Sequence, residues 1–124
     1  MSCLILLFMI FCHIVDDYYL QGWLASAKQK KLWQNNAPQS LYKYDYIVAL
    51  FMHSFSWAFM ITLPLTIHYL LYGGQWYLSL FIANIIVHSV VDDMKANQLK
   101  INLIQDQTIH LLQIIVTWFL CVVV

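Results

Sequence analysis

Long apolar runs alternate with short polar stretches along this chain of 124 residues. About 20 apolar residues are enough for a helix to cross the ~30 Å of hydrocarbon in a bilayer. The pattern therefore predicts membrane helices over residues 3–21, 45–72, 74–93 and 103–124. Together they make the whole chain one all-α integral membrane domain (residues 1–124), a polytopic bundle of four transmembrane helices.

The polar connections between these runs differ in charge. Every lysine lies in the first or the third connection, residues 22–44 and 94–102, whereas the second is the uncharged turn Gly73-Gly74. A bundle of four spans places the first and third connections on the same side of the membrane. By the positive-inside rule both are cytoplasmic, and both termini are on the non-cytoplasmic side. We therefore expect a multi-pass protein of the bacterial inner (cytoplasmic) membrane.

The composition favours the same class of protein. Hydrophobic residues make up 62% of the chain and charged residues 10%, against about half and a quarter in soluble domains. This excess of apolar surface makes the lipid bilayer the first expected partner. The formal net charge is zero, so we expect no nucleic-acid partner. Pro64, inside the second predicted helix, predicts a kink there.

Histidine and aspartate recur four residues apart within the predicted helices. The pairs with this spacing are His13 and Asp17, His88 and Asp92, and Asp106 and His110. On a helix this spacing places both side chains one turn apart on the same face. A charged group at the bilayer centre costs roughly 2.5–3.5 kcal/mol, so ionisable residues in membrane helices are candidates for a functional site.

Each predicted helix carries polar groups at a similar depth near the cytoplasmic side, the second through His53. We expect these stripes to face inward and to form one cluster open to the cytoplasm. The predicted metal ligands are His13, Asp17, His53, His88, Asp92, Asp106 and His110. The residues predicted to support the ligands or orient a substrate are Gln21, Lys95, Gln107, Asp16 and Asp93.

Imidazole and carboxylate groups together suit a divalent transition metal, and zinc is our first expectation. The set is large enough for one or two ions. A metal-activated water with a carboxylate as general base (Asp17, Asp92 or Asp106) would hydrolyse a lipid-linked or phosphoester substrate. The sequence thus predicts an intramembrane metal-dependent hydrolase.

Four boxes give the chain a resemblance to a family of small integral membrane proteins of tailed phages and bacteria, domain of unknown function 3307. The boxes are His13, Asp17 and Gln21, with Trp23, Ala25 and Lys28 after them; the lone His53; His88, Asp92, Asp93 and Lys95; and Asp106, Gln107 and His110. They cover nearly the whole chain. The resemblance implies an integral membrane protein encoded by a phage or prophage and supplies no activity.

Three other functions stay open at this point. The chain could bind a host membrane protein without catalysis, in superinfection exclusion or as a lysis accessory. It could carry protons or cations, since chains of aspartate and histidine serve as relays. Alternatively, buried His–Asp pairs could fasten the helices together with no ion, although polar contacts between membrane helices contribute only about 0.6–2 kcal/mol each.

Overall fold

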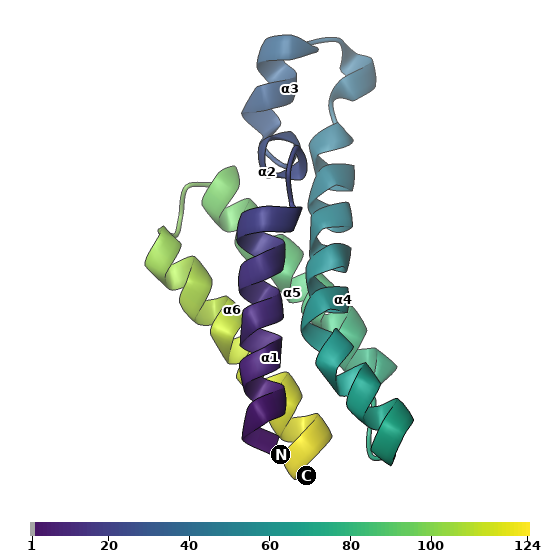
Figure 1. Cartoon of the computed structure of the whole chain (residues 1–124). Helices are drawn as coiled ribbons and strands as arrows, with labels where there is room; N and C mark the ends of the chain where they lie inside the picture. The colour runs from purple at the N-terminus through teal and green to yellow at the C-terminus, as the bar shows by residue number, and fades with distance from the viewer. Residues whose placement is uncertain (1) are drawn as a thin grey trace.

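The computed structural model describes residues 2–124 as an all-α chain (Figure 1). Its helices are α1 (Ser2–Val15), α2 (Leu24–Ala27), α3 (Lys30–Asn36), α4 (Asp45–Tyr72), α5 (Leu78–Ala96) and α6 (Leu103–Trp118). A π-helical turn extends α1 over Asp16–Leu20, another extends α6 over Phe119–Val123, and a 3₁₀ turn covers Ser40–Tyr42. The sequence pattern did not predict the short helices α2 and α3 within the first connection.

The four long helices form a bundle in which α4 packs against α1 and α5, and α6 packs against α5 and α1. Both chain termini lie at one end of the bundle, and α2 and α3 lie at the other (Figure 1). The connection between α5 and α6 lies toward the α2–α3 end as well. The two lysine-bearing connections therefore share one end of the molecule, as the sequence predicted.

Three helical stretches of the described residues are long and apolar enough to cross a membrane: Ser2–Leu20, Ser40–Tyr72 and Leu103–Val123. The prediction of four spans is wrong, because α5 does not qualify. Its helix begins at Leu78 rather than Gly74 and ends with the charged residues Asp92, Asp93 and Lys95. The part of α5 before Asp92 is apolar but shorter than a membrane-spanning helix needs. This helix nevertheless packs in the bundle with the other three.

The second predicted helix is present with the expected bounds, and it runs through Pro64 without a break. Its C-terminal half turns away from its N-terminal half (Figure 1), in line with the predicted kink. A proline removes one backbone hydrogen bond from the helix. Nearby threonines add side-chain bonds to other carbonyls of the helix: Thr62 Oγ1 donates to the Ala58 carbonyl at 2.7 Å, and Thr66 Oγ1 donates to the Thr62 carbonyl at 3.0 Å.

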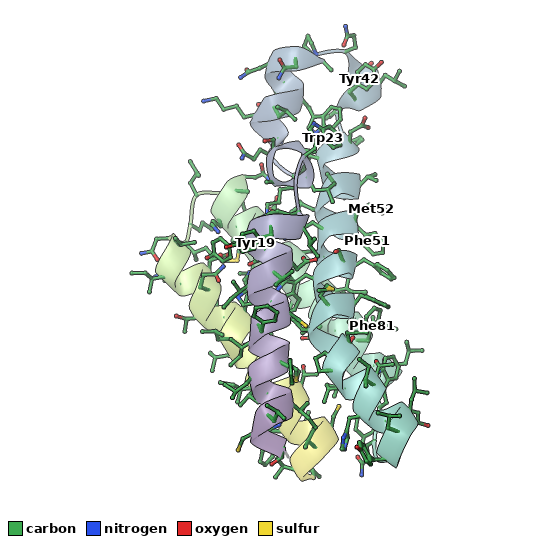
Figure 2. The ribbon with its side chains drawn as sticks, viewed as in Figure 1. Tyr19, Trp23, Tyr42, Phe51, Met52 and Phe81 are labelled. Carbon is green, nitrogen blue, oxygen red and sulfur yellow. The ribbon has the colours of Figure 1, made fainter. Side chains whose placement is uncertain are left out.

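The bundle exposes many apolar side chains and buries both a polar and an apolar set of side chains. Large apolar side chains such as Tyr19, Phe51 and Met52 are exposed and point away from the bundle (Figure 2). A layer of apolar side chains, including Met9, Trp57 and Ile114, is fully buried between the helices. Exposed apolar surface of this extent marks a membrane-facing surface.

A buried polar contact joins α5 to α6. Asn84 Nδ2 donates to Thr117 Oγ1 at 2.8 Å, and Gln113 Nε2 donates to the Asn84 side-chain oxygen at 3.2 Å. Alanine in place of Asn84 removes both bonds, so we expect the free energy of unfolding to fall by about 0.6–1.7 kcal/mol, the measured range for such contacts. Unfolding of the detergent-solubilised protein by denaturant would measure the change.

The matched control for this variant is Asn36→Ala. Asn36 is exposed and donates only to the Leu32 carbonyl of its own helix, so its replacement should change the free energy of unfolding by less than about 0.5 kcal/mol. Equal stabilities of the Asn84 and Asn36 variants would contradict this interpretation of the α5–α6 contact.

Candidate metal centre

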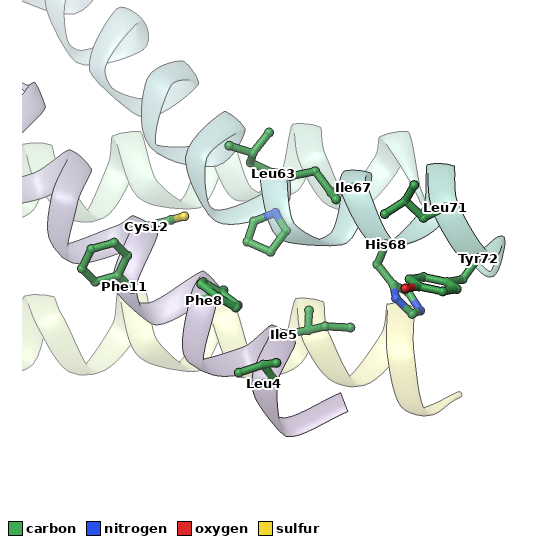
Figure 3. A pocket seen from close by; sticks show the side chains of 11 residues that line it. Leu4, Ile5, Phe8, Phe11, Cys12, Leu63, Ile67, His68, Leu71 and Tyr72 are labelled. Carbon is green, nitrogen blue, oxygen red and sulfur yellow. The ribbon is translucent and has the colours of Figure 1, made fainter. Parts of the chain in front are cut away.

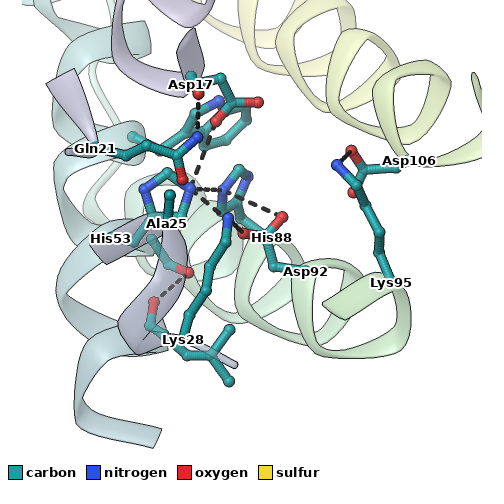
Figure 4. A network of polar contacts seen from close by, with 12 residues as sticks. Asp17, Gln21, Ala25, Lys28, His53, His88, Asp92, Lys95 and Asp106 are labelled. Carbon is teal, nitrogen blue, oxygen red and sulfur yellow. Dashed lines mark hydrogen bonds and ion pairs between the residues drawn. The ribbon is translucent and has the colours of Figure 1, made fainter. Parts of the chain in front are cut away.

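Six ionisable side chains from the four long segments of the bundle meet at one place, toward the α2–α3 end (Figure 4). We call this set the His/Asp cluster: Asp17, His53, His88, Asp92, Asp106 and His110. Each of them is at most 8% exposed. The sequence predicted that all four helices would contribute to one buried polar site, and the structure brings these six side chains together.

The wide π-helical turn at the end of α1 supplies the first carboxylates. Its closing hydrogen bond runs from the Gln21 N–H to the Asp16 carbonyl at 3.1 Å, five residues apart. Neighbouring residues of a regular α-helix are about 100° apart around its axis. In this turn the consecutive residues Asp16 and Asp17 are both buried. π-Helical turns are frequent at functional sites.

Asp17, His53 and His88 form the first group of side chains that could hold a metal ion. The Nε2 atoms of His53 and His88 are 3.2 Å apart. Asp17 Oδ1 is 3.5 Å from His53 Nε2. The three ligand atoms therefore converge from α1, α4 and α5.

His88, Asp92 and His110 form the second group. His110 Nε2 is 3.3 Å from Asp92 Oδ1 and 3.4 Å from Asp106 Oδ1. The other oxygen of Asp92, Oδ2, is 3.3 Å from His53 Nε2. Asp92 thus presents one oxygen to each group, the geometry of a carboxylate that bridges two ions.

These separations are those of ligands around a tetrahedral ion. Metal–ligand bonds of 2.0–2.1 Å give ligand atoms about 3.3 Å apart along the edges of a tetrahedron. Four pairs of atoms lie close to this value, at 3.2–3.4 Å: His53 with His88, His53 with Asp92, His110 with Asp92, and His110 with Asp106. His88 Nε2 and Asp92 Oδ1, at 3.8 Å, are further apart.

The far side of the imidazole ring decides which nitrogen can bind a metal. His110 Nδ1 is 3.2 Å from the Gln113 side-chain oxygen, which is an acceptor. Nδ1 therefore carries the proton, and the Nε2 lone pair faces the cluster. Metal-binding histidines are usually held in this way.

His53 has a carboxylate behind it. Its Nδ1 is 3.8 Å from Asp16 Oδ2, and Ser56 Oγ donates to the other oxygen of Asp16 at 2.6 Å. A carboxylate hydrogen-bonded to the far nitrogen fixes the ring orientation of a metal-binding histidine. Asp16 lies near this nitrogen without forming that hydrogen bond, so its supporting role stays a prediction.

The cluster contains buried polar atoms without a hydrogen-bond partner among the described residues. They are Asp16 Oδ2, Asp17 Oδ1, Gln21 Oε1, His53 Nδ1, His88 Nδ1, Asp106 Oδ1 and His110 Nε2. Leaving a buried polar group unpartnered costs about 1–3 kcal/mol, and more for a charged one. A bound ion would satisfy Asp17, Asp106 and His110, so the donor set fits a metal.

Two lysines partly neutralise the carboxylates. Lys28 Nζ donates to Asp92 Oδ2 at 2.5 Å, and Lys95 Nζ donates to Asp106 Oδ2 at 2.8 Å (Figure 4). Asp16 and Asp17 add two further carboxylates to the site, so four carboxylates face two ammonium groups. With all of them ionised and the histidines neutral, as metal ligands are, the balance is two negative charges, which one divalent cation neutralises.

His13 lies beside the cluster and outside both groups. Trp57 Nε1 donates to His13 Nδ1 at 2.8 Å, and His13 Nε2 is 3.0 Å from the Gln107 side-chain oxygen. Both ring nitrogens are therefore engaged. Gln107 Nε2 in turn donates to Asp17 at 3.2 Å and Asp106 at 3.0 Å, so Gln107 contacts two carboxylates of the cluster, and its predicted orienting role stays a prediction.

Two other predicted residues lie away from the ligand groups. Asp93 accepts from Asn97 at 2.8 Å and Gln98 at 2.7 Å at the end of α5, so it does not join the cluster. Gln21 donates to the Asp17 backbone carbonyl and lines the pocket above the cluster.

Trp57 forms the floor of the cluster, a role that the sequence did not predict. Its ring stacks on His88 with centroids 4.2 Å apart, and His110 stacks on His88 at 4.1 Å. Trp57 itself is fully buried and belongs to the apolar core. It therefore separates the His/Asp cluster from the apolar half of the bundle. An apolar tryptophan in a membrane helix gives no sequence signal of such a position.

A polar pocket of about 350 Å³ lies above the cluster at the α2–α3 end. We call it the lysine pocket; its lining residues are Gln21, Ala25, Lys28, Gln29, Asp92, Lys95 and Ala96. A second pocket, of about 440 Å³, lies between α1 and α4 and is lined mainly by apolar side chains (Figure 3). It contains His68 but no residue of the cluster.

Comparison with known proteins finds no match: no family model, curated protein or solved structure is similar to this chain. The family resemblance expected from the four boxes therefore stays a prediction. What the chain does has to be argued from the geometry of the His/Asp cluster, which belongs to an all-α chain with three helices suited to a membrane.

Proposed function

We propose that this chain is a membrane protein that binds a divalent transition metal and uses it to hydrolyse a substrate at the cytoplasmic side. Zinc is the metal that we expect first. One observation carries the proposal. The ligand atoms of two buried groups of histidine and aspartate converge, with atom pairs separated by 3.2–3.8 Å within the groups. Imidazole nitrogen with carboxylate oxygen is a donor set that zinc accepts.

The two groups support one or two ions. They share His88, whose Nε2 can bind only one ion at a time. A first ion would take Asp17, His53 and His88, and a second would take Asp92, Asp106 and His110. Asp92 would then bridge, because its two oxygens face different histidines. Paired ions with a bridging carboxylate are a common arrangement in hydrolases.

A bound divalent ion would supply Lewis acidity and a more acidic water. The chain's own residues provide the rest of the chemistry. With a single ion on Asp17, His53 and His88, Asp106 is not a ligand, and its Oδ1, which carries no hydrogen bond, is free to accept a proton as a general base. Trp57 and the apolar layer below it exclude water from the other half of the bundle.

A metal accounts for the convergence of ligand atoms, and the alternatives left open by the sequence stay separate proposals. A proton path has some polar groups beyond the cluster, since hydrogen bonds lead from His110 through Gln113 and Asn84 to Thr117. Helix fastening without an ion would need protonated histidines to balance the carboxylates, and His53 and His110 lie 3.3–3.5 Å from carboxylate oxygens. A host membrane partner stays a separate proposal, on the exposed apolar surface.

The lysine pattern supports an orientation for this site. All lysines lie at the α2–α3 end or in the α5–α6 connection, and positive charge is retained on the cytoplasmic side. The His/Asp cluster would then face the cytoplasm of a bacterium, with both termini outside. An origin in a phage or prophage is the corresponding proposal from the family resemblance.

Metal analysis of the purified chain tests the proposal. We expect about one or two equivalents of zinc per chain after purification in mild detergent without chelators, because buried preformed ligands bind zinc tightly. The zinc-loaded protein should then hydrolyse phosphoester substrates, and this hydrolysis should be lost after dialysis against a chelator. A transition-metal content below about 0.1 equivalent, after incubation with zinc, would contradict metal binding.

A further inference from the structure

The lysine pocket is a polar opening that reaches the His/Asp cluster through Asp92. An inference about it rests on the proposed function, because it names the substrate class of the same site. The pocket walls place two ammonium groups beside the candidate metal ligands, at Lys28 and Lys95. Two alanines, Ala25 and Ala96, keep the space between them open.

Each ammonium group has donors to spare. A lysine ammonium has three N–H bonds, and in the described residues each of these two lysines has a single hydrogen-bond acceptor: Asp92 for Lys28 and Asp106 for Lys95. Two donors of each lysine are therefore free for a ligand. Lys95 is about one-third exposed at 36%, and Lys28 is 13% exposed, so both reach the pocket from its walls.

The charge balance indicates the sign of the ligand. Four ionised carboxylates and two ammonium groups leave two negative charges in the site. One divalent ion makes the site neutral, and a second makes it positive by two charges. The carboxylates would then be occupied by metal, and the two ammonium groups would need another anion. A phosphate dianion matches both this charge and the several acceptors that the lysines require.

The position of Lys28 is fixed by the end of α5. Asn97 Nδ2 donates to the Lys28 carbonyl at 3.0 Å, and the Lys30 N–H donates to Asn97 Oδ1 at 2.7 Å. These bonds hold the segment between α2 and α3 against α5. Opposite Lys28, Gln21 presents a buried oxygen that lacks a hydrogen-bond partner. That oxygen is an acceptor for a hydroxyl group of a ligand.

We propose that the lysine pocket binds the phosphoryl group of a phosphomonoester, with Lys28 and Lys95 donating to its oxygens. The phosphorus would lie beside Asp92, next to the candidate metal groups. The phosphoryl group is the shared chemistry of two sources, a monoester lipid headgroup such as that of phosphatidic acid at the cytoplasmic surface and a small phosphomonoester in solution. Both reach a pocket that opens at the α2–α3 end of the bundle.

Binding of inorganic phosphate to the full chain tests this inference. We would use calorimetry on zinc-loaded protein in nanodiscs of phosphatidylcholine. Lys28→Gln and Lys95→Gln should each weaken phosphate binding by about tenfold or more, the effect of one charge-assisted hydrogen bond. Lys95→Arg should retain binding because it keeps the charge. The matched control is Lys31→Gln, since Lys31 is exposed on α3 and does not line the pocket.

Zinc content, measured on every sample, separates this inference from the proposed function. Normal zinc content with phosphate binding that neither lysine variant weakens, or with no phosphate binding at all, overturns the phosphoryl site alone. Absence of zinc from the unmodified chain overturns the proposed function and the phosphoryl site with it. Competition by phosphatidic acid in the nanodisc would support a lipid source, and competition by a soluble phosphomonoester alone would support a free one.

Discussion

Replacement of His88 by alanine is expected to lower the zinc affinity by more than about 100-fold. His88 is the one residue common to both candidate metal groups, so each group loses a ligand in this variant. Even residues that only support metal ligands change affinity by about 10–100-fold, and loss of a ligand should exceed that range. Competition for zinc with a coloured chelator would measure the effect on the detergent-solubilised protein.

Two histidine variants serve as controls. His68 lies far along α4, where its ring contacts Tyr72 with centroids 5.2 Å apart, so His68→Ala should leave the zinc affinity unchanged. His13→Ala should lower it by less than His88→Ala, because both nitrogens of His13 already have partners. Stoichiometric, tight zinc in the His88 variant would show that the ion is not held by these groups.

Removal of the metal is expected to lower the midpoint of thermal unfolding by roughly 5 °C or more. A ligand present at 100 times its dissociation constant stabilises the folded state by about 2.7 kcal/mol, and each kcal/mol corresponds to several degrees in a domain of this size. In this bundle the ion also neutralises the excess carboxylate charge of Asp16, Asp17, Asp92 and Asp106. Thermal scans with zinc and with a chelator would measure the shift.

The His88→Ala variant is the control for this second experiment. Its midpoints with zinc and with chelator should differ by less than those of the unmodified protein, because the ligand shared by both groups is missing. A chelator that lowers both midpoints equally would indicate an effect on the detergent or elsewhere on the chain. An unchanged midpoint in the unmodified protein would contradict a metal contribution to stability.

The apolar runs of the sequence predicted the four long helices. The bounds of α4, Asp45–Tyr72, were predicted correctly because its apolar run begins and ends at polar or glycine residues. The start of α5 was misplaced, because Gly73 through Tyr77 form an extended connection rather than a two-glycine turn. Short helices α2 and α3 were missed because their few residues show no apolar periodicity of their own.

The candidate site was predictable where spacing along one helix sets it. The four-residue separations of His88 from Asp92 and of Asp106 from His110 place each pair on one inward face. Which partner each side chain takes depends on packing between helices. The bond from Trp57 that engages His13 joins α4 to α1, and the approach of Lys28 to Asp92 depends on the path of the first connection.

The π-helical turn at Asp16–Leu20 makes the length of the first helix part of the design of this site. Removing a single residue just after it would restore ordinary helical winding and rotate the upstream segment by about 100° relative to the rest of the chain. Asp16 and Asp17 could then no longer both face inward, although every side chain of the cluster would still be present. In homologous chains, a gap within this turn would therefore be as informative as the loss of a ligand.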